Sequence, residues 1–251
     1  MTAPPAPPTP QLQRMREYER WLGRPGVSGA LMRWAMGPLG VYFVNSPLFR
    51  LPENLQLDPS LRVLEVGCGR GSLLRMLQER VRFDQRPAGI DYSVRALRLA
   101  QRDEARAGRP LRLARATATD LPFGGGSFDL VLCGHMVKHL SDEELIDFLR
   151  ETKRVLAVGG LALIWDFAPS GNVLLDRWNR RLLSTGVAGL KLRSSQALLQ
   201  TSELAGFDFV RDANLRPFLL PPMPRASVLL GLPPEAPSPD AEPPEARTGA
   251  G

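Results

Sequence analysis

A glycine-rich turn between an apolar run and a helical run constrains this chain more than any other feature. Arg62–Val66 is short, apolar and β-branched, which predicts a buried parallel strand. Gly67, Gly69 and Gly71 follow it, and Ser72 then begins a run with leucines at helical spacing. A strand, a glycine loop and a helix N-terminus in this order predict a small-molecule site at the carboxyl edge of an α/β sheet.

The spacing of the loop distinguishes between two cofactor classes, because its G-x-G-x-G pattern differs from the G-x-G-x-x-G of dinucleotide-binding enzymes. Glu65, inside the strand just before the loop, supplies a carboxylate that would neutralise a bound cation and repel a pyrophosphate. The segment 63–74 closely resembles the first motif of the class I S-adenosylmethionine-dependent methyltransferases. The resemblance implies S-adenosyl-L-methionine as the cofactor. It assigns cofactor contacts to Glu65, Gly67, Cys68, Gly69 and Gly71.

Short apolar runs and helical runs alternate along the rest of the chain, which predicts an α/β fold. Together with the resemblance, this predicts a doubly wound, mostly parallel, seven-stranded sheet of the Rossmann-like methyltransferase type. Parallel strands are expected at Arg62–Val66, Pro87–Asp91, Leu111–Ala114, Phe128–Cys133 and Leu161–Trp165. A final antiparallel pair is expected at Phe207–Leu215 and Ala226–Leu230. Helices are expected at Ser93–Arg106, Asp142–Leu156 and Ser194–Leu204, with a helical insertion at Ser170–Lys191.

Local signals mark the ends of several of these elements. Ser93 is a predicted N-cap, and Ser141 with Glu144 three residues later predicts a capping box. Gly159-Gly160 is expected to form the connection between the preceding helix and the fifth strand.

Composition divides the chain into four segments. Residues 1–10 and 233–251 are rich in proline and are expected to be disordered tails, because they cannot bury a core. Residues 11–58 form a predicted helical extension or lid on the methyltransferase domain at 59–232. The four tryptophans lie in this extension, at the end of the fifth strand and in the insertion, which favours an apolar acceptor pocket beneath the extension. The alternative is that they only pack the appendages onto the sheet.

Asp91 is expected to bind the ribose of the cofactor. It lies at the end of the second expected strand, twenty residues after Gly71. A carboxylate at this place can accept hydrogen bonds from both ribose hydroxyls. Tyr92 follows it and is assigned to the same site.

The adenine is expected to contact the segment 116–123, which with 127–129 resembles the family's next motif. The family's adenine-binding aspartate falls on Thr117 here, which departs from the pattern. The resemblance then implies adenine contacts from the Thr117 hydroxyl and the Ala118 N–H, because a hydroxyl can still accept from the adenine amine. Asp120 is the alternative acceptor.

The loop 133–140 after the fourth expected strand is expected to face the acceptor. By resemblance, the backbone of Cys133 and Gly134 lies near the methionyl part of the cofactor. His139 matches a position that often carries histidine, and its imidazole could take a proton from an attacking hydroxyl. Asp166, at the end of the fifth strand, could orient His139 or hold the substrate. A histidine satisfied within its loop and an aspartate that caps the next loop are the alternatives.

Composition and missing motifs limit the classes of partner that this protein is expected to bind. The net charge is +6, but the basic residues are nearly all arginine without interleaved aromatics, which disfavours a nucleic-acid site. The N/D-P-P-Y/F motif of amino-directed nucleic-acid methyltransferases is also absent after the fourth strand. No apolar run reaches the ~18 residues that span a bilayer, so only peripheral membrane contact stays open. With two cysteines and no secretory signal, a cytoplasmic location is expected, and no metal site is predicted.

The sequence as a whole predicts an enzyme that transfers a methyl group from S-adenosylmethionine to a small-molecule acceptor. An apolar or aromatic hydroxyl compound is the expected acceptor class. An NAD(P)-binding oxidoreductase is disfavoured by Glu65, by the glycine spacing and by the absence of Tyr-x-x-x-Lys. A catalytically inactive, methyltransferase-like binding protein is the other alternative, and Thr117 is its main support.

Overall fold

The computed structural model describes residues 10–23, 25–26, 30, 34, 55, 57–107, 110–183, 189–215 and 224–233, and the structural statements below concern these residues. Nearly all of the two expected tails lies outside the described residues, as does most of the expected extension after Leu22.

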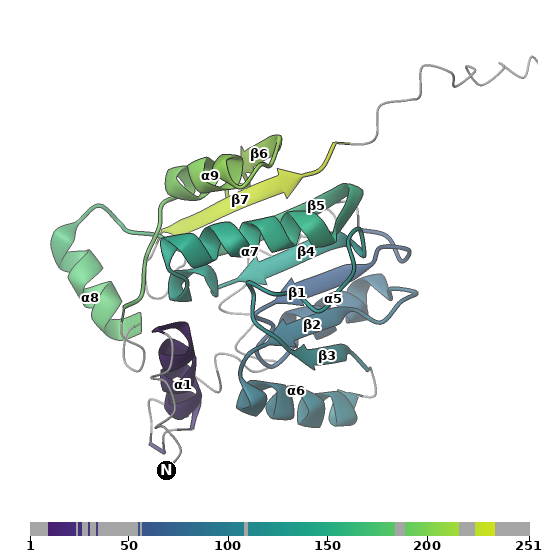
Figure 1. Ribbon diagram of the computed structural model, residues 1–251. Coiled ribbons are helices and arrows are strands. Elements are labelled where there is room, and N and C mark those ends of the chain that lie inside the picture. Colours follow the sequence, from purple (N-terminus) through teal and green to yellow (C-terminus); the bar gives the residue numbers. More distant parts are fainter. Residues whose placement is uncertain are drawn as a thin grey trace, which may run out of the picture.

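A seven-stranded sheet with the strand order β3-β2-β1-β4-β5-β7-β6 forms the centre of the described chain (Figure 1). The strands are β1 (Val63–Val66), β2 (Ala88–Asp91), β3 (Arg112–Arg115), β4 (Phe128–Gly134), β5 (Leu156–Phe167), β6 (Phe209–Asp212) and β7 (Arg225–Gly231). The first five are parallel, and β7 pairs antiparallel with both β5 and β6. The predicted doubly wound, mostly parallel sheet is therefore confirmed. Because the strand order reverses between β1 and β4, a ligand crevice is expected at the carboxyl ends of these strands.

Helices cover both faces of this sheet. The described helices are α1 (Pro10–Leu22), α5 (Ser72–Val81), α6 (Val94–Ala107), α7 (Asp142–Val155), α8 (Val173–Leu183), α9 (Ser195–Leu204) and the short 3₁₀ helix η2 (Val137–His139). On one face, Phe148 of α7 and Leu198 of α9 belong to the same buried cluster as Val131 of β4. On the other face, Leu74 of α5 packs in a cluster with Leu132, the next residue of β4. Adjacent strand residues thus serve opposite layers, as the strand period of two requires.

The predicted helix starts are confirmed by side-chain hydrogen bonds. The Ser93 hydroxyl accepts from the Ala96 N–H at 3.1 Å. At the start of α7, Ser141 and Glu144 form the reciprocal capping box, with each side chain bonded to the other residue's backbone N–H.

The prediction for Gly159-Gly160 is wrong, because both glycines lie inside β5 rather than in a connection before it. α7 passes at Leu156 directly into β5, and Leu156 pairs with Phe128. Leu161 then pairs with Leu130, so the β5 side of the ladder contains three extra residues at this point. Gly159 has a φ of 76°, which allows the strand to bulge where the register shifts.

α1 lies beside the carboxyl ends of the central strands (Figure 1), and the predicted helix in this part of the extension is confirmed. Leu22 at its end is 2% exposed and packs with Ala96 of α6. At the other end, the Arg14 guanidinium binds the Glu144 carboxylate at 2.5 and 2.7 Å. The helix is therefore held to the domain on two sides of the crevice. Among the described residues, the helices are too short or too polar to cross a bilayer.

Candidate functional site

The loop between β1 and α5 has the conformation that its glycines allow. Gly67, Gly69 and Gly71 have φ angles of 76°, 54° and 67°, in the left-handed region that most side chains avoid. The N–H groups of Gly67 and Cys68 both donate to the Ile90 carbonyl at 2.9 Å. The predicted ligand loop is thus tied by its backbone to the end of β2.

Asp91 at the end of β2 connects to the same loop through its carboxylate. Oδ2 accepts from the Gly69 N–H and Oδ1 accepts from the Ser93 N–H, both at 2.8 Å. Burial raises the pKa of Asp91 to about 6, although the two N–H groups oppose this shift. Each carboxylate oxygen can accept a second hydrogen bond. Asp91 lines a cavity, so the carboxylate could bind two neighbouring hydroxyls of a ligand.

Glu65 is a buried carboxylate with an unsatisfied oxygen. Its side chain lies within β1, and Oε2 has no hydrogen-bond partner among the described residues. Burial raises the pKa of Glu65 well above its usual range, Asp91 raises it further, and Arg75 opposes both. A buried carboxylate oxygen that lacks a hydrogen-bond partner costs free energy. A cationic ligand nearby would relieve this cost by attraction.

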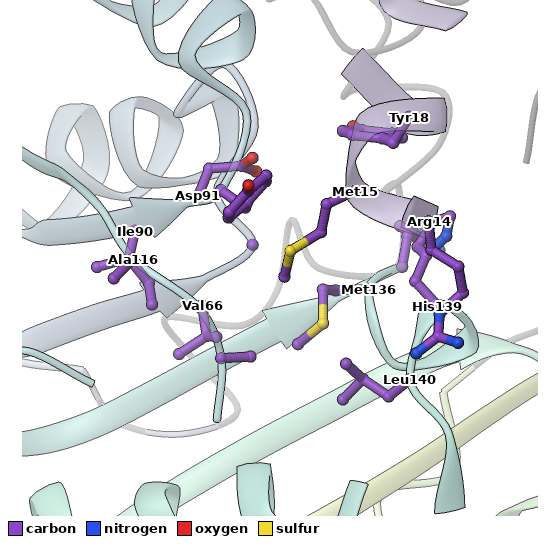
Figure 2. A pocket seen from close by; sticks show the side chains of 14 residues that line it. Arg14, Met15, Tyr18, Val66, Ile90, Asp91, Ala116, Met136, His139 and Leu140 are labelled. Carbon is purple, nitrogen blue, oxygen red and sulfur yellow. The ribbon is translucent and has the colours of Figure 1, made fainter. Parts of the chain in front are cut away.

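A cavity of about 120 Å³ lies between the ends of β1 and β2, the loop after β4, and α1 (Figure 2). The predicted site residues that line it are Gly67, Asp91, Tyr92, Ala118 and His139. The other predicted residues lie outside this lining, namely Glu65, Cys68, Gly69, Gly71, Thr117, Cys133, Gly134 and Asp166. The cavity therefore has the predicted position, while eight of the thirteen predicted residues do not line it.

The sequence predicted an extension that covers the site, but it did not indicate which residues of α1 face the cavity. Arg14, Met15 and Tyr18 line it from α1, and Figure 2 shows Met15 and Met136 pointing into the space between the two sides. Small-molecule sites usually measure about 300–1,000 Å³. The α1 side chains therefore occupy part of the volume that a ligand would need. The helical spacing of Met15 and Tyr18 was the available signal, but it could not show which surface they face.

The expected adenine segment contributes small residues to the lining. Ala116 and Ala118 line the cavity, while Thr117 forms an isolated antiparallel bridge with Asp120. The Asp120 N–H donates to the Thr117 carbonyl at 3.4 Å, so the two side chains flank a tight turn. This arrangement leaves Thr117 and Asp120 as the two candidate acceptors for a ligand's amine.

Gly134 has a packing role that the sequence did not reveal. A Cβ on Gly134 would lie 2.4 Å from Cζ2 of Trp165 on the neighbouring strand. Trp165 is fully buried within the core on the α5 side of the sheet. The absence of a side chain at Gly134 therefore lets the indole pack beneath the end of β4.

The expectation that tryptophans gather around the cavity is wrong for the described ones. Trp165 is buried in the core, Trp178 on α8 is 65% exposed, and Trp34 is 47% exposed. These three residues do not line the cavity. The side chain of Trp21 lies outside the described residues. Apolar contact in the cavity comes instead from methionine, leucine, tyrosine and valine.

Asp166 is held by partners other than the expected His139. Its Oδ2 accepts from the Lys138 N–H at 2.9 Å, and its Oδ1 lies 3.3 Å from the Lys138 ammonium. Nδ1 of His135 lies 3.9 Å from the same Oδ1. The expectation that Asp166 orients His139 is thus corrected, since the carboxylate lies against His135 and Lys138.

His139 lies under α1, with its ring centroid 5.6 Å from that of Tyr18. Burial lowers the pKa of His139 to about 3, and the Lys138 charge acts in the same direction. This imidazole therefore stays neutral near pH 7. A conjugate acid with so low a pKa makes His139 a weak proton acceptor.

Comparison with known proteins points to one family. The model of the family described as "Methyltransferase domain" matches residues 63–160. Ajmaline N-methyltransferase of Rauvolfia serpentina is 34% identical over 142 residues, which cover 54% of this chain and 47% of that protein. Demethylmenaquinone methyltransferase of Thermus thermophilus is 34% identical over 108 residues, which cover 43% of this chain and 48% of that protein. The chain thus matches about half the length of each relative.

The fold is also found among solved structures. An S-adenosylmethionine-dependent methyltransferase from Methanosarcina mazei has a TM-score of 0.59 and 19% sequence identity. The likeness covers 73% of this chain and 97% of that chain. The seven-stranded architecture is therefore shared over nearly the whole of that protein.

Proposed function

We propose that the chain is a class I S-adenosylmethionine-dependent methyltransferase, on the evidence of its segment 63–160, and that it methylates a small-molecule acceptor. One observation carries the proposal. Asp91 at the end of β2 joins the glycine loop that follows β1, and its charge acts on the buried carboxyl of Glu65. This junction offers acceptors for ribose hydroxyls and negative charge for a cation. Bound S-adenosylmethionine would supply a methyl group activated by a positively charged sulfur.

The residues of the crevice fit the parts of this cofactor. We assign the ribose to the free acceptor positions of Asp91, with Tyr92 beside it in the cavity wall. The adenine would contact the Ala118 N–H and the Thr117 hydroxyl. Glu65 would attract the positive charge of the cofactor from behind the lining, because a buried carboxylate with one unsatisfied oxygen is stabilised by a nearby cation.

The remaining predicted residues would bind through the backbone. Gly67, Cys68, Gly69 and Gly71 shape the loop beneath the cofactor. The end of β4 at Cys133 and Gly134 adjoins the methionyl part in this assignment.

The acceptor side of the cavity supports an apolar small molecule. Met15, Tyr18, Met136 and Leu140 line it and come from α1 and from the loop after β4. The named relatives methylate ajmaline and demethylmenaquinone, and both names denote small molecules rather than macromolecules. We therefore propose an apolar small molecule as the acceptor, bound between α1 and the cofactor, and within this class we propose an apolar or aromatic hydroxyl compound.

Calorimetric titration of the full chain with S-adenosylhomocysteine and with NADH tests the cofactor. We expect binding of S-adenosylhomocysteine alone. Asp91→Ala should weaken it by ~1.5–3 kcal/mol, or roughly 10–100-fold, since a hydrogen bond to a charged group is lost. Asp147→Ala, which removes an exposed carboxylate on α7, is the matched control and should leave the affinity unchanged. Binding of NADH without binding of S-adenosylhomocysteine would contradict the proposal.

A binding protein without catalysis is the second candidate, because Thr117 replaces the family's acidic residue. Turnover separates the two. Formation of S-adenosylhomocysteine in the presence of a panel of apolar phenols and amines supports the enzyme. Tight cofactor binding with no product from any acceptor would favour the binding protein.

A further inference from the structure

The resemblance to the methyltransferase family suggested His139 as the proton acceptor, but the structure places another histidine against a buried carboxylate. We propose that His135, positioned by Asp166, is the general base of the methyl transfer, and that the acceptor is a hydroxyl compound. This inference rests on the proposed function and deepens it, because it names the group that takes the acceptor's proton.

The backbone of His135 has an unusual conformation at the cavity. Its φ is 58°, a region that costs a non-glycine residue of order 1 kcal/mol or more. The His135 N–H donates to the Trp165 carbonyl at 2.9 Å, which fixes this conformation between β4 and β5. The side chain that follows from it lines the cavity. The strained backbone of His135 thus lies directly after β4, where its titratable side chain faces the ligand site.

The ring of His135 is held by two aromatic neighbours. Its centroid lies 4.9 Å from that of Phe167, at an interplanar angle of 34°. It also meets Trp165 edge-on, at 6.3 Å and 87°. These contacts restrict rotation of the imidazole, so its two nitrogens have defined directions. One of them, Nδ1, is the nitrogen near Asp166.

Asp166 is buried and ionised, so it can stabilise a positive charge on the imidazole of His135. It is 2% exposed, and its oxygens accept from the N–H groups of Lys138 at 2.9 Å and Phe167 at 2.8 Å. Burial alone would raise its pKa, but the Lys138 charge and the contact with His135 hold the pKa well below its usual range. Asp166 therefore stays ionised throughout the neutral range.

Three charged groups from three elements act on the protonation of His135. Burial lowers its pKa, and the charges of Lys138 on η2 and Arg225 on β7 act in the same direction, while Asp166 on β5 opposes them. The resting imidazole is neutral at pH 7 and can accept a proton. At 3.9 Å the Nδ1–Oδ1 separation is longer than a hydrogen bond, and such contacts commonly shorten when the reacting complex forms.

Proton removal by His135 balances the reaction of a hydroxyl acceptor. The acceptor oxygen forms a bond to the methyl carbon while the carbon–sulfur bond breaks, and the bonding pair remains on sulfur. The hydroxyl proton passes to the imidazole of His135, which becomes a cation beside Asp166. Release of that proton to water restores the neutral imidazole. His139, with its low pKa under Tyr18, is unsuited to hold the proton in this step.

The chain contains only two histidines, which makes a direct test practical. Protein labelled with ¹⁵N-histidine and carrying no histidine tag gives two imidazole spin systems, assigned with His135→Asn and His139→Asn. In the complex with S-adenosylhomocysteine, we expect His135 to protonate at a higher pH than His139. Asp166→Asn should lower the pKa of His135 by at least one unit, since it removes the carboxylate that opposes the effect of burial. Asp147→Asn, on the surface of α7, should leave it unchanged.

Turnover and binding supply the second readout. With a phenol series as acceptors, His135→Asn should lower kcat by ~10²–10⁴-fold, while the Kd for S-adenosylhomocysteine changes less than about threefold. Asp166→Asn should shift the acidic limb of the kcat profile to lower pH. The inference is overturned if Asp166→Asn leaves the pKa of His135 in place, or if His135→Asn methylates phenols at the wild-type rate. The proposed function fails separately if the wild-type chain does not bind S-adenosylhomocysteine.

Discussion

Oδ2 of Asp91 accepts a 2.8 Å hydrogen bond from the N–H of Gly69, so the end of β2 and the glycine loop form one unit. The second oxygen of Asp91 holds the Ser93 N–H at the start of α6. A residue assigned to the ribose thus also fixes the loop under the cofactor. Because of this double role, ligand affinity should depend on whether Asp91 is ionised.

Cofactor affinity should therefore depend on pH near the pKa of Asp91, which is about 6 in the free protein. Ribose hydroxyls donate to the ionised carboxylate, so binding favours that form and lowers the pKa in the complex. The Kd for S-adenosylhomocysteine should consequently be constant above about pH 7 and rise as the pH falls below 6. Calorimetry between pH 5 and 8 measures this. Asp91→Asn should bind more weakly and lose most of the pH dependence, and an unchanged profile would exclude Asp91 as the titrating group.

A substitution at Thr117 should increase the affinity for S-adenosylhomocysteine. Thr117→Asp would restore a charged acceptor for the adenine amine, and charged acceptors bind more strongly than hydroxyls. We expect a lower Kd for S-adenosylhomocysteine, measured by calorimetry. Asp120 lies across the bridge, so its charge would oppose that of the new carboxylate. The double variant with Asp120→Asn should therefore bind more tightly still. A weaker Kd in both variants would assign the adenine contact to another residue.

Gly134 should tolerate no side chain. Gly134→Ala would place a Cβ 2.4 Å from the buried indole of Trp165, and overpacking of this kind costs about 1–3 kcal/mol or more. Gly124→Ala is the matched control, because its nearest neighbour would be the Ser127 hydroxyl oxygen at 3.6 Å. Urea unfolding of both variants gives the two free energies. Equal stabilities would show that Trp165 moves aside without cost.

His139 should make the folded state less stable in acid. Its pKa is lowered from 6.5 to about 3 by burial, so between these values the unfolded chain binds more protons than the folded chain. The stabilising contribution is complete above pH 6.5 and is lost progressively as the pH falls toward 3. The free energy of unfolding of His139→Asn should decrease less than that of the wild type over this range. If the free energy of unfolding decreases equally in the two proteins, groups other than His139 cause the acid sensitivity.

The sequence predicted those features that local patterns determine. The glycine loop, Asp91 at the end of a strand, and the Ser141–Glu144 capping box each depend on residues a few positions apart. The partner of Asp166 could not be predicted in this way, because the positive φ of His135 and the burial of Lys138 decide it. The bulge at Gly159 was missed for a related reason. A glycine pair is typical of turns, and only the pairing of β5 with β4 shows that the strand continues.

The contribution of α1 also lay beyond sequence patterns. Its helical spacing was clear, but Tyr18 meets His139, and Arg14 meets Glu144, across more than a hundred residues of chain. Such contacts are set by the packing of the whole domain. They show which residues of the expected extension form one wall of the cavity.

Removal of that wall is the last prediction. A chain without residues 1–49 keeps every residue assigned to the cofactor, and it loses Arg14, Met15 and Tyr18 from a cavity of about 120 Å³. We expect it to fold and to bind S-adenosylhomocysteine with equal or lower Kd, because α1 no longer occupies part of the ligand volume. Acceptor turnover should fall strongly, since Met15 and Tyr18 form the proposed acceptor wall and exclude water from the transfer.

A point variant separates this effect from loss of folding. Arg14→Leu keeps the helix but removes the ion pair with Glu144. This ion pair joins α1 to α7 at a distance of 2.5 Å. The variant should raise the association rate of S-adenosylhomocysteine in stopped-flow binding, because α1 opens more readily. Arg16→Leu, on the same helix and outside the cavity lining, is the matched control.

If the truncated chain methylates an identified acceptor at the wild-type rate, α1 is packing alone, because an acceptor wall that contributes binding cannot be removed without loss of turnover.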